Sequence, residues 1–213
     1  MTTTTGPVAA ERAYAHTKAR IISGDLPGGA LVSEGAIGAE LGISRTPVHE
    51  AFLLLSAEQL IELVSRKGAI VRPMTHREAE DVLAMRKGIE SASAAQVFAT
   101  GGPAERFAGL FTENLERQRH HVDAGDVSGF VAADDDFHAL MVEASGNPVA
   151  QHFYEELRSR QQRLRNLLLR VDPANLMSSY DDHRELADCF LRSDAARFAD
   201  SLDTHLDRYQ GAI

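Results

Sequence analysis

The stretch GISRTPVHEAFLLLSAEQLIELVSRKGAIVRP, residues 42–73, decides the fold of the first third of the chain. Ser44 is a residue type that often occupies the N-cap of a helix, and Pro47 falls within the first turn, where its missing N–H costs nothing. The apolar positions that follow recur at helical spacing, namely Val48, Ala51, Phe52 and Leu55. We therefore predict a helix over residues 44–56 that packs along this apolar stripe.

A shorter helix precedes this one. Ser33 can cap a helix that runs to Leu41, and Gly42 then ends it. Only Gly42 and Ile43 therefore separate the two predicted helices. This spacing is typical of a helix-turn-helix.

Two short β-leaning segments follow, LIELV (60–64) and AIVRP (69–73). Between them lie Arg66, Lys67 and Gly68, which form a basic, glycine-containing tip. Two strands joined by such a tip predict a β-hairpin that projects from the helices as a wing.

These patterns divide the chain into three parts. Residues 1–10, MTTTTGPVAA, are predicted to be a disordered tail, and residues 11–74 a small α+β winged helix-turn-helix that begins with a helix over 11–23. Residues 75–213 are predicted to be an all-α antiparallel helical bundle. Its helices are delimited by the capping box at Thr75 and by the breaks and caps at 101–103, Asp126, 145–148, 172–173 and Asp194. In its first helix, Val82, Met85, Ile89 and Val97 are expected to face inward.

Composition narrows the class of protein. The single cysteine excludes an internal disulfide, and there is neither a run of 18 apolar residues nor the basic and apolar regions of a signal peptide. We expect a cytoplasmic protein with no membrane partner. Residues 1–74 carry seven basic and seven acidic residues, so the net charge of −9 lies wholly in the remainder. This asymmetry indicates two domains with different partners.

The helix over 44–56 presents groups that suit DNA. Ser44 and Thr46 can donate to phosphate oxygens, Arg45 can take a guanine edge bidentately, and His49 lies one turn further on. The wing with Arg66, Lys67 and Gly68 can reach the backbone or minor groove. A capped helix with an exposed arginine occurs in many proteins, but its combination with a preceding helix and a basic wing favours a DNA-reading domain.

The run Asp134-Asp135-Asp136-Phe137-His138 raises a second possibility for chemistry. On a helix, Asp134 and His138 share one face and can bind one metal ion together, while Asp135 and Asp136 are expected to point to solvent. His183 and His205 each lie on a later amphipathic helix and can also face the interior. Three imidazoles and one carboxylate suit a divalent ion: zinc above all, with nickel, manganese or iron as alternatives. The other interpretation is a metal-free bundle whose histidines are satisfied by hydrogen bonds.

The first domain resembles the winged helix-turn-helix of the GntR superfamily of transcription regulators, through its G-I-S-R-T-P-V core, the following E-A and the R-K-G wing. The resemblance implies that Arg45, Thr46, position 49 and the wing around Lys67 and Gly68 contact operator DNA. This chain has His49 where the family usually has Arg. Gly35 and Gln59 also depart from the family pattern, where a larger polar residue and Gly respectively are more usual.

Residues 75–210 resemble the all-helical effector domain called FCD. The family pattern is met by Arg86 and Glu90, by Asp134 and His138, by Ser145-Gly146-Asn147, and by His183 and His205. The resemblance implies that Asp134 and the three histidines are metal ligands and that a small carboxylate effector sits over the metal, paired with Arg86. Arg163 and Arg165 are weaker candidates, because RSRQQRLR (158–165) is also typical of an exposed basic face.

Together these features predict a ligand-responsive regulator. It is expected to act as a homodimer on near-palindromic operator DNA. The resemblance to the family implies that it is a repressor and that an organic acid relieves the repression. Two alternatives remain, a metal-dependent enzyme that uses the three-histidine, one-aspartate site and a sensor for which the metal is the signal.

Overall fold

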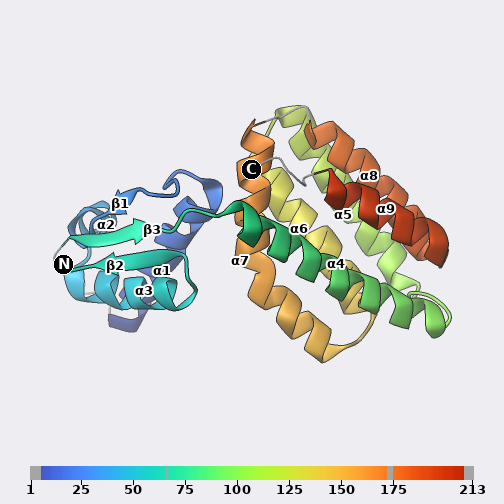
Figure 1. The fold of residues 1–213 in the computed structure, drawn as a ribbon, viewed down its shortest axis with the longest axis horizontal. Coiled ribbons are helices and arrows are strands. Elements are labelled where there is room, and N and C mark those ends of the chain that lie inside the picture. Colours follow the sequence, from blue (N-terminus) through green and yellow to red (C-terminus); the bar gives the residue numbers. More distant parts are fainter. Residues whose placement is uncertain (1–5, 66, 172–174, 209–213) are drawn as a thin grey trace. The chain divides into compact units, whose positions relative to one another are not determined.

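The structure is a computed structural model that describes residues 6–65, 67–171 and 175–208 of the 213. The chain divides into two compact units between Met74 and Thr75, and each unit has its own core (Figure 1). The first is a small winged helix-turn-helix and the second is helical throughout its described residues. Both parts of the predicted fold class are confirmed.

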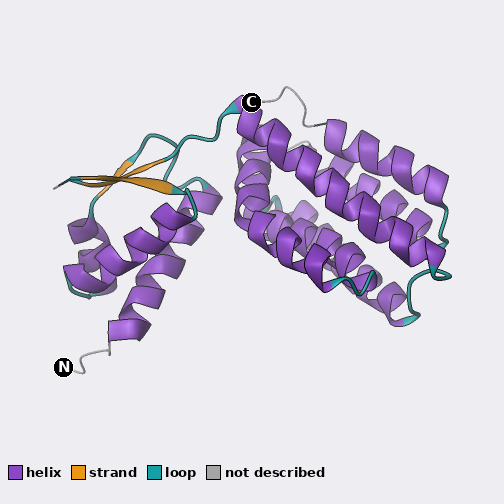
Figure 2. Cartoon of the chain, turned by 60° about the horizontal axis from the view of Figure 1, so that its bottom comes forward, coloured by secondary structure: helices purple, strands orange, loops and turns teal. Residues whose placement is uncertain are grey.

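Among its described residues, the first unit contains three helices and a three-stranded antiparallel sheet. The helices are α1 (Gly6–Ser23), α2 (Glu34–Leu41) and α3 (Arg45–Ala57), and the strands are β1 (Leu31–Val32), β2 (Ile61–Val64) and β3 (Gly68–Val71). The strands lie in the order β1-β3-β2, on one side of the helices (Figure 2). The two-residue strand β1 was not predicted. Helix α1 begins before residue 11, so the predicted disordered tail is wrong for residues 6–10, while residues 1–5 lie outside the described residues.

The helix-turn-helix depends on a close approach at its turn. The backbone N–H of Ile43 donates to the carbonyl of Gly38 at 2.9 Å, and a Cβ on Gly38 would lie 2.9 Å from the carbonyl oxygen of Ile43. Gly42 provides the left-handed conformation that ends α2, with φ of 66°. Ser33 and Ser44 occupy the predicted N-cap positions, although neither side chain makes the capping hydrogen bond.

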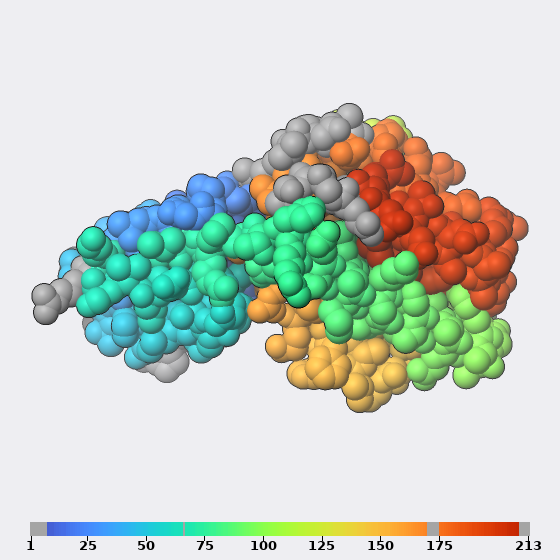
Figure 3. Space-filling view, in the orientation of Figure 1, coloured from blue at the N-terminus to red at the C-terminus, as the bar shows by residue number. Residues whose placement is uncertain are grey.

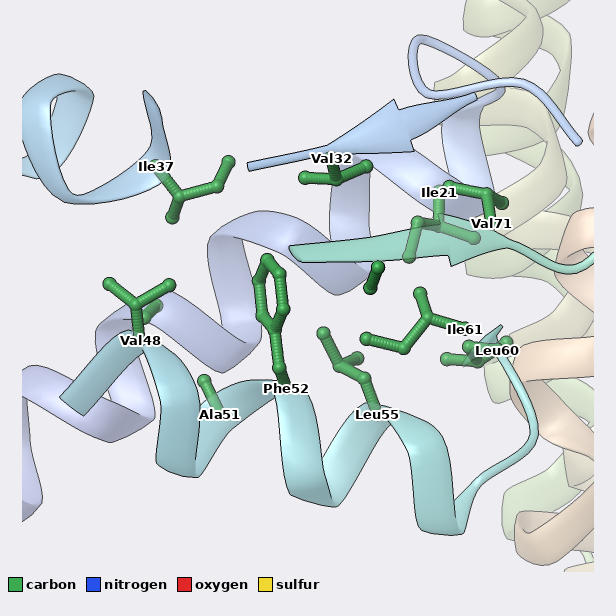
Figure 4. Close-up of a cluster of buried hydrophobic side chains, with 12 residues drawn as sticks. Ile21, Val32, Ile37, Val48, Ala51, Phe52, Leu55, Leu60, Ile61 and Val71 are labelled. Carbon is green, nitrogen blue, oxygen red and sulfur yellow. The ribbon is translucent and has the colours of Figure 1, made fainter. Parts of the chain in front are cut away.

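The predicted inner stripe of α3 forms the core of this unit. Val48, Ala51, Phe52 and Leu55 are fully buried. In Figure 4 these side chains point from α3 toward Ile21 of α1, Ile37 of α2 and the sheet residues Val32, Ile61 and Val71. Apolar contacts therefore attach the wing to the helices, and they hold Lys67 and Gly68 near the start of α3.

Glycine is required where the wing turns into β3. Gly68 has φ of 108°, and a Cβ at this position would lie 2.2 Å from the carbonyl oxygen of Val32 in β1. The neighbouring strands pair Val64 with Gly68 and Val32 with Ala69, so this close approach belongs to the sheet itself.

We expect the substitution Gly68→Ala to lower the free energy of unfolding of the first unit by about 2–4 kcal/mol, because it adds a steric clash to an unfavourable backbone conformation. Gly42→Ala is the matched control. It also has positive φ but meets no atom within 4 Å, and should cost only about 1–2 kcal/mol. Differential scanning calorimetry of the full chain measures both, and equal melting temperatures for the two variants would contradict the assignment.

The second unit consists of α4 (His76–Ala99), α5 (Arg106–Ala124), α6 (Val127–Ala144), α7 (Pro148–Val171), α8 (Asn175–Leu191) and α9 (Ala195–Asp207). Three predicted caps are made: Thr75, Asp126 and Asp194 each accept a hydrogen bond from a backbone N–H three residues on. Helix α4, green in Figure 3, borders both α9 in red and α7 in light orange. Within the described residues no helix is long and apolar enough to cross a membrane.

The inner face of α4 differs from the prediction. Val82 and Val97 are buried as expected, but Met85 is 54 % exposed. The interior positions include Arg86, Glu90 and Ser93, all buried. A polar stripe therefore runs through the centre of the helical unit, and it is there that the candidate site lies.

Candidate metal centre and DNA-reading surface

The first turns of α3 form an exposed polar surface. Ser44, Arg45, Thr46 and His49 are all exposed, as predicted. Arg45 and His49 line one surface hollow of about 400 Å³ together with Lys67 and Gly68 of the wing. The structure thus brings together four of the predicted DNA-contacting residues; Arg66 lies outside the described residues.

Two residues of α2, Glu34 and Gly35, lie beside the polar side chains of this surface. Glu34 lies 2.7 Å from Nδ1 of His49, so the imidazole is held by a carboxylate. A Cβ on Gly35 would stand 3.4 Å from Nη2 of Arg45, so the absence of a side chain leaves room for the guanidinium. The sequence showed that positions 35 and 49 depart from the family pattern, and the structure places both beside Arg45.

The four predicted metal ligands meet in the helical unit. Each of Asp134, His138, His183 and His205 is buried, and each offers one donor atom such that all four atoms lie within 4.8 Å of one another. They come from three helices, because α6 carries Asp134 and His138 one turn apart while α8 and α9 carry one histidine each.

Each imidazole is oriented by an oxygen on its outer side. Nδ1 of His138 lies 2.8 Å from Oε2 of Glu90, Nδ1 of His183 lies 2.6 Å from Oε1 of Gln118, and Nδ1 of His205 lies 3.3 Å from Oδ2 of Asp182. Such outer partners fix the ring tautomer and orientation in metal sites.

The partner of His183 is itself fixed by a relay. The carbonyl of Ala133 can only accept, so Asn114 donates its Nδ2–H to it at 3.0 Å. Oδ1 of Asn114 then accepts from Nε2 of Gln118 at 2.7 Å, which turns Oε1 of Gln118 toward His183. His183 must therefore donate its Nδ1–H, and its Nε2 lone pair faces the centre.

His138 has the same arrangement, because Glu90 is its acceptor. Nε2 of His138 lies 3.2 Å from Nε2 of His183, so two lone pairs face each other in the buried interior. Burial lowers the pKa of both histidines, so a shared proton is disfavoured. A cation between the nitrogens resolves this contact: two nitrogens bound tetrahedrally to zinc lie about 3.3 Å apart. The donor set therefore fits a divalent metal ion.

Asp134 connects the metal ligands to two arginines. Oδ1 of Asp134 lies 3.2 Å from Nε2 of His183 and 2.5 Å from Nη2 of Arg165, while Oδ2 lies 3.6 Å from Nη2 of Arg86. Burial alone would raise the pKa of Asp134, yet Arg165 and Arg86 hold it well below its ordinary value. Asp134 is thus a carboxylate, as a metal ligand must be.

Two predictions about side-chain direction are wrong. Arg165 is only 1 % exposed, so it does not belong to an exposed basic face and is better placed near the site than Arg163, which is half-buried. Asp135 is also buried: it pairs with Nε of Arg158 at 2.6 Å, and burial raises its pKa to about 7. Asp136 is half-exposed, closer to the prediction.

The sequence did not reveal the outer partners of the histidines. Gln118 and Asp182 follow no recognisable spacing, and Glu90 was noted only as part of the family pattern. One available signal was amphipathicity. Asn114 and Gln118 lie one turn apart on the apolar face of α5, which begins with Phe107 and Phe111, so two amides in that stripe indicate a buried polar layer.

Each of the two units matches a known protein family. Residues 9–71 match the family described as bacterial regulatory proteins, gntR family, and residues 81–208 match the FCD domain. The chain belongs to the GntR family and carries an FCD domain. The members are transcription regulators, so the alternative of a metal-dependent enzyme is set aside.

Named relatives of this GntR regulator cover most of its length. The gluconate operon transcriptional repressor of Bacillus subtilis is 25 % identical over 201 residues, which is 91 % of this chain and 80 % of the relative. The probable D-xylose utilization operon transcriptional repressor of Paenarthrobacter nicotinovorans is 29 % identical over 191 residues, 89 % of this chain and 81 % of the relative. Among solved structures, McbR/YncC of E. coli has the same fold, with a TM-score of 0.78 at 19 % identity over 98 % of this chain and 95 % of the other.

We expect Arg165→Met to destabilise the helical unit of this GntR regulator by about 3–5 kcal/mol, because it removes a cation from a buried carboxylate. Arg163→Met, two residues away on the same helix and half-buried, should cost less than about 1 kcal/mol. Urea unfolding followed by circular dichroism measures the difference. Equal losses in the two variants would show that Asp134 does not depend on Arg165.

Proposed function

We propose that this regulator is a repressor whose helical unit binds a divalent metal ion and a small organic acid, and that the acid changes the affinity of the winged unit for operator DNA. The single observation that carries the metal part is the pair of imidazole lone pairs of His138 and His183, 3.2 Å apart and both oriented inward. With Asp134 and His205 they would hold the ion. When bound, the ion supplies positive charge and, by expanding from four to five ligands, a position for an anion.

Zinc suits this donor set best, because three imidazoles and one carboxylate are ligands that zinc accepts in a four-coordinate site. Nickel, manganese or iron remain acceptable to the same groups. All four ligands are buried, which favours a resident ion over the alternative of a metal sensor, because a sensor has to release its ion readily.

The proposal of an organic acid rests on a buried arginine, Arg86, which has an unused hydrogen-bond donor. Nη2 of Arg86 is buried 3.6 Å from Asp134 and makes no hydrogen bond within the described residues. A guanidinium N–H with this spare capacity can pair with the carboxylate of an effector. Two relatives are repressors, one named for a gluconate operon and one for a D-xylose utilization operon, which is consistent with regulation of carbon metabolism by this chain as well.

The DNA part rests on the surface shared by α3 and the wing. Ser44, Arg45, Thr46 and His49 would enter or flank the major groove, while Lys67 and Gly68 of the wing would contact the adjacent backbone or minor groove. A homodimer would present two such surfaces to a near-palindromic operator. A coupling of about 1–3 kcal/mol between acid and DNA would change operator affinity by about 5–150-fold.

The metal proposal is tested by zinc titration of the purified full chain. Wild-type protein should bind one zinc ion per chain. His183→Gln should weaken binding by at least about 100-fold, because even the loss of an outer partner of a ligand costs 10–100-fold. His121→Gln, a histidine outside the cluster, is the control. Zinc retained by His183→Gln would place the ion elsewhere, and no zinc in the wild type would favour the metal-free bundle.

The DNA proposal is tested by fluorescence anisotropy with a duplex from immediately upstream of the regulator's own gene and a scrambled duplex of equal length. We expect tighter binding to the upstream duplex. Arg45→Ala should weaken that binding by about 5–150-fold, through loss of a base contact worth about 1–3 kcal/mol. Arg77→Ala, an exposed arginine of the helical unit, should leave it unchanged. If Arg45→Ala binds as well as wild type, Arg45 does not read the operator.

A further inference from the structure

Several polar side chains of α4 and α7 are buried without the hydrogen bonds that burial normally requires. Tyr154 and Gln161, both on α7, are each 3 % exposed. Within the described residues, the hydroxyl of Tyr154 and both polar atoms of the Gln161 amide have no hydrogen-bond partner, and the same is true of Nη2 of Arg86. Native proteins contain few such atoms, so a group of them calls for an explanation.

These side chains belong to one place in the helical unit. Tyr154, Gln161 and Arg165 are spaced seven and four residues apart, so they lie along one face of α7. That face packs against α4, which carries Arg86, and against α6, which carries Asp134. Arg165 reaches Asp134 directly, and Asp134 lies beside Arg86, so the stripe on α7 leads into the proposed effector site.

The chemistry of the unpartnered atoms points to a particular kind of ligand. Nη2 of Arg86 is a donor and matches a carboxylate. The Gln161 amide has a nitrogen with two N–H donors and an acceptor oxygen to satisfy, and the Tyr154 hydroxyl can either donate or accept. An aliphatic acid would satisfy only the donor of Arg86 and would leave the amide of Gln161 in contact with methylene groups. A chain of alcohol groups both donates and accepts along its length, and so matches all of them.

We propose that the effector is a polyhydroxylated carboxylic acid whose hydroxyl groups are recognised by Gln161 and Tyr154. This inference rests on the proposed function, since it takes the carboxylate to be bound at Arg86. Gln161 and Tyr154 then determine specificity. They reject plain acids of the same length, because a site built for hydroxyl groups leaves its own polar atoms unpaired when the hydroxyls are missing.

The test compares gluconate with hexanoate, two six-carbon monocarboxylic acids of which only gluconate carries hydroxyl groups, and includes xylonate and galactonate as further hydroxy acids. Isothermal titration calorimetry on the zinc-loaded full chain measures binding, and release from the operator duplex provides a second readout. Wild-type protein should bind at least one hydroxy acid about 100-fold or more tightly than hexanoate.

Gln161→Leu should weaken binding of that hydroxy acid by about 10–100-fold and leave hexanoate binding unchanged or tighter. Tyr154→Phe should act in the same direction. Gln151→Leu, an exposed glutamine at the start of the same helix, is the control and should alter neither. Without any acid, Gln161→Leu should melt at a higher temperature than wild type, because the variant removes an unpaired amide from the interior; a merely structural role for Gln161 predicts a lower melting temperature.

The outcomes separate the two proposals. Arg86→Met should abolish binding of hydroxy acids and hexanoate alike, which tests the carboxylate site itself. Equal affinity of wild type for hexanoate and the hydroxy acids would overturn the specificity inference and leave the organic-acid proposal standing. Binding of none of the acids would overturn both. A Gln161→Leu variant that melts lower and still discriminates as wild type does would also overturn the inference.

Discussion

The helical unit depends on one constraint: two imidazole nitrogens, both carrying lone pairs, face each other 3.2 Å apart in its interior. The constraint is imposed from outside the pair. Glu90 holds His138, and the relay from the carbonyl of Ala133 through Asn114 and Gln118 holds His183. The relay starts at the backbone carbonyl of Ala133, next to Asp134, so its first hydrogen bond is anchored to α6 itself. The positions of the two imidazoles are thus set by the packing of α5 against α6 and α8.

The same interior contains more buried charge than a stable core needs. Arg86 and Arg165 surround Asp134, and Arg86 also donates to Oε1 of Glu90 at 2.8 Å. Each charge there is tolerated because another compensates it, so removal of one member leaves its partner unpaired. Replacement of buried ion pairs by well-packed apolar residues is often neutral or stabilising. On the proposed function, the polar centre is a binding site maintained at a cost in stability rather than a means of holding the helices together.

Sequence reasoning succeeded where side-chain spacing alone fixes direction. Asp134 and His138, one turn apart, had to share a face, and the apolar stripe of α3 had to face a core. It failed where the core is not apolar. Met85 was expected inside and Arg165 outside because hydrophobicity was used to identify the buried face, whereas on α4 and α7 that face carries Arg86, Glu90, Tyr154, Gln161 and Arg165. Periodicity locates one face of a helix, but only the neighbouring helices decide which face is covered. Strand β1 was missed for a related reason: two residues carry no alternation, and the pairing is made by β3.

The structure explains three positions at which the sequence departs from the family pattern, namely Gly35, His49 and Gln59. Gln59 stands where Gly is more usual and has φ of 62°, so the left-handed turn after α3 is retained at a cost that its hydrogen bonds to Arg72 and to the carbonyl of Ser56 help to offset. Gly35 and His49 lie beside Arg45, so they alter what the recognition surface offers without changing the fold beneath it. In both units apolar contacts form the scaffold, and the polar groups that depart from simple expectation lie mainly at the proposed DNA-reading surface and at the proposed metal and acid site. On the proposed function this division also explains the coupling. A cation at the three histidines would share Asp134 with the arginines and weaken their hold on it, and Arg86 would then be available to an incoming carboxylate. Metal and acid would in that case bind to one electrostatic unit, and each would raise the affinity for the other.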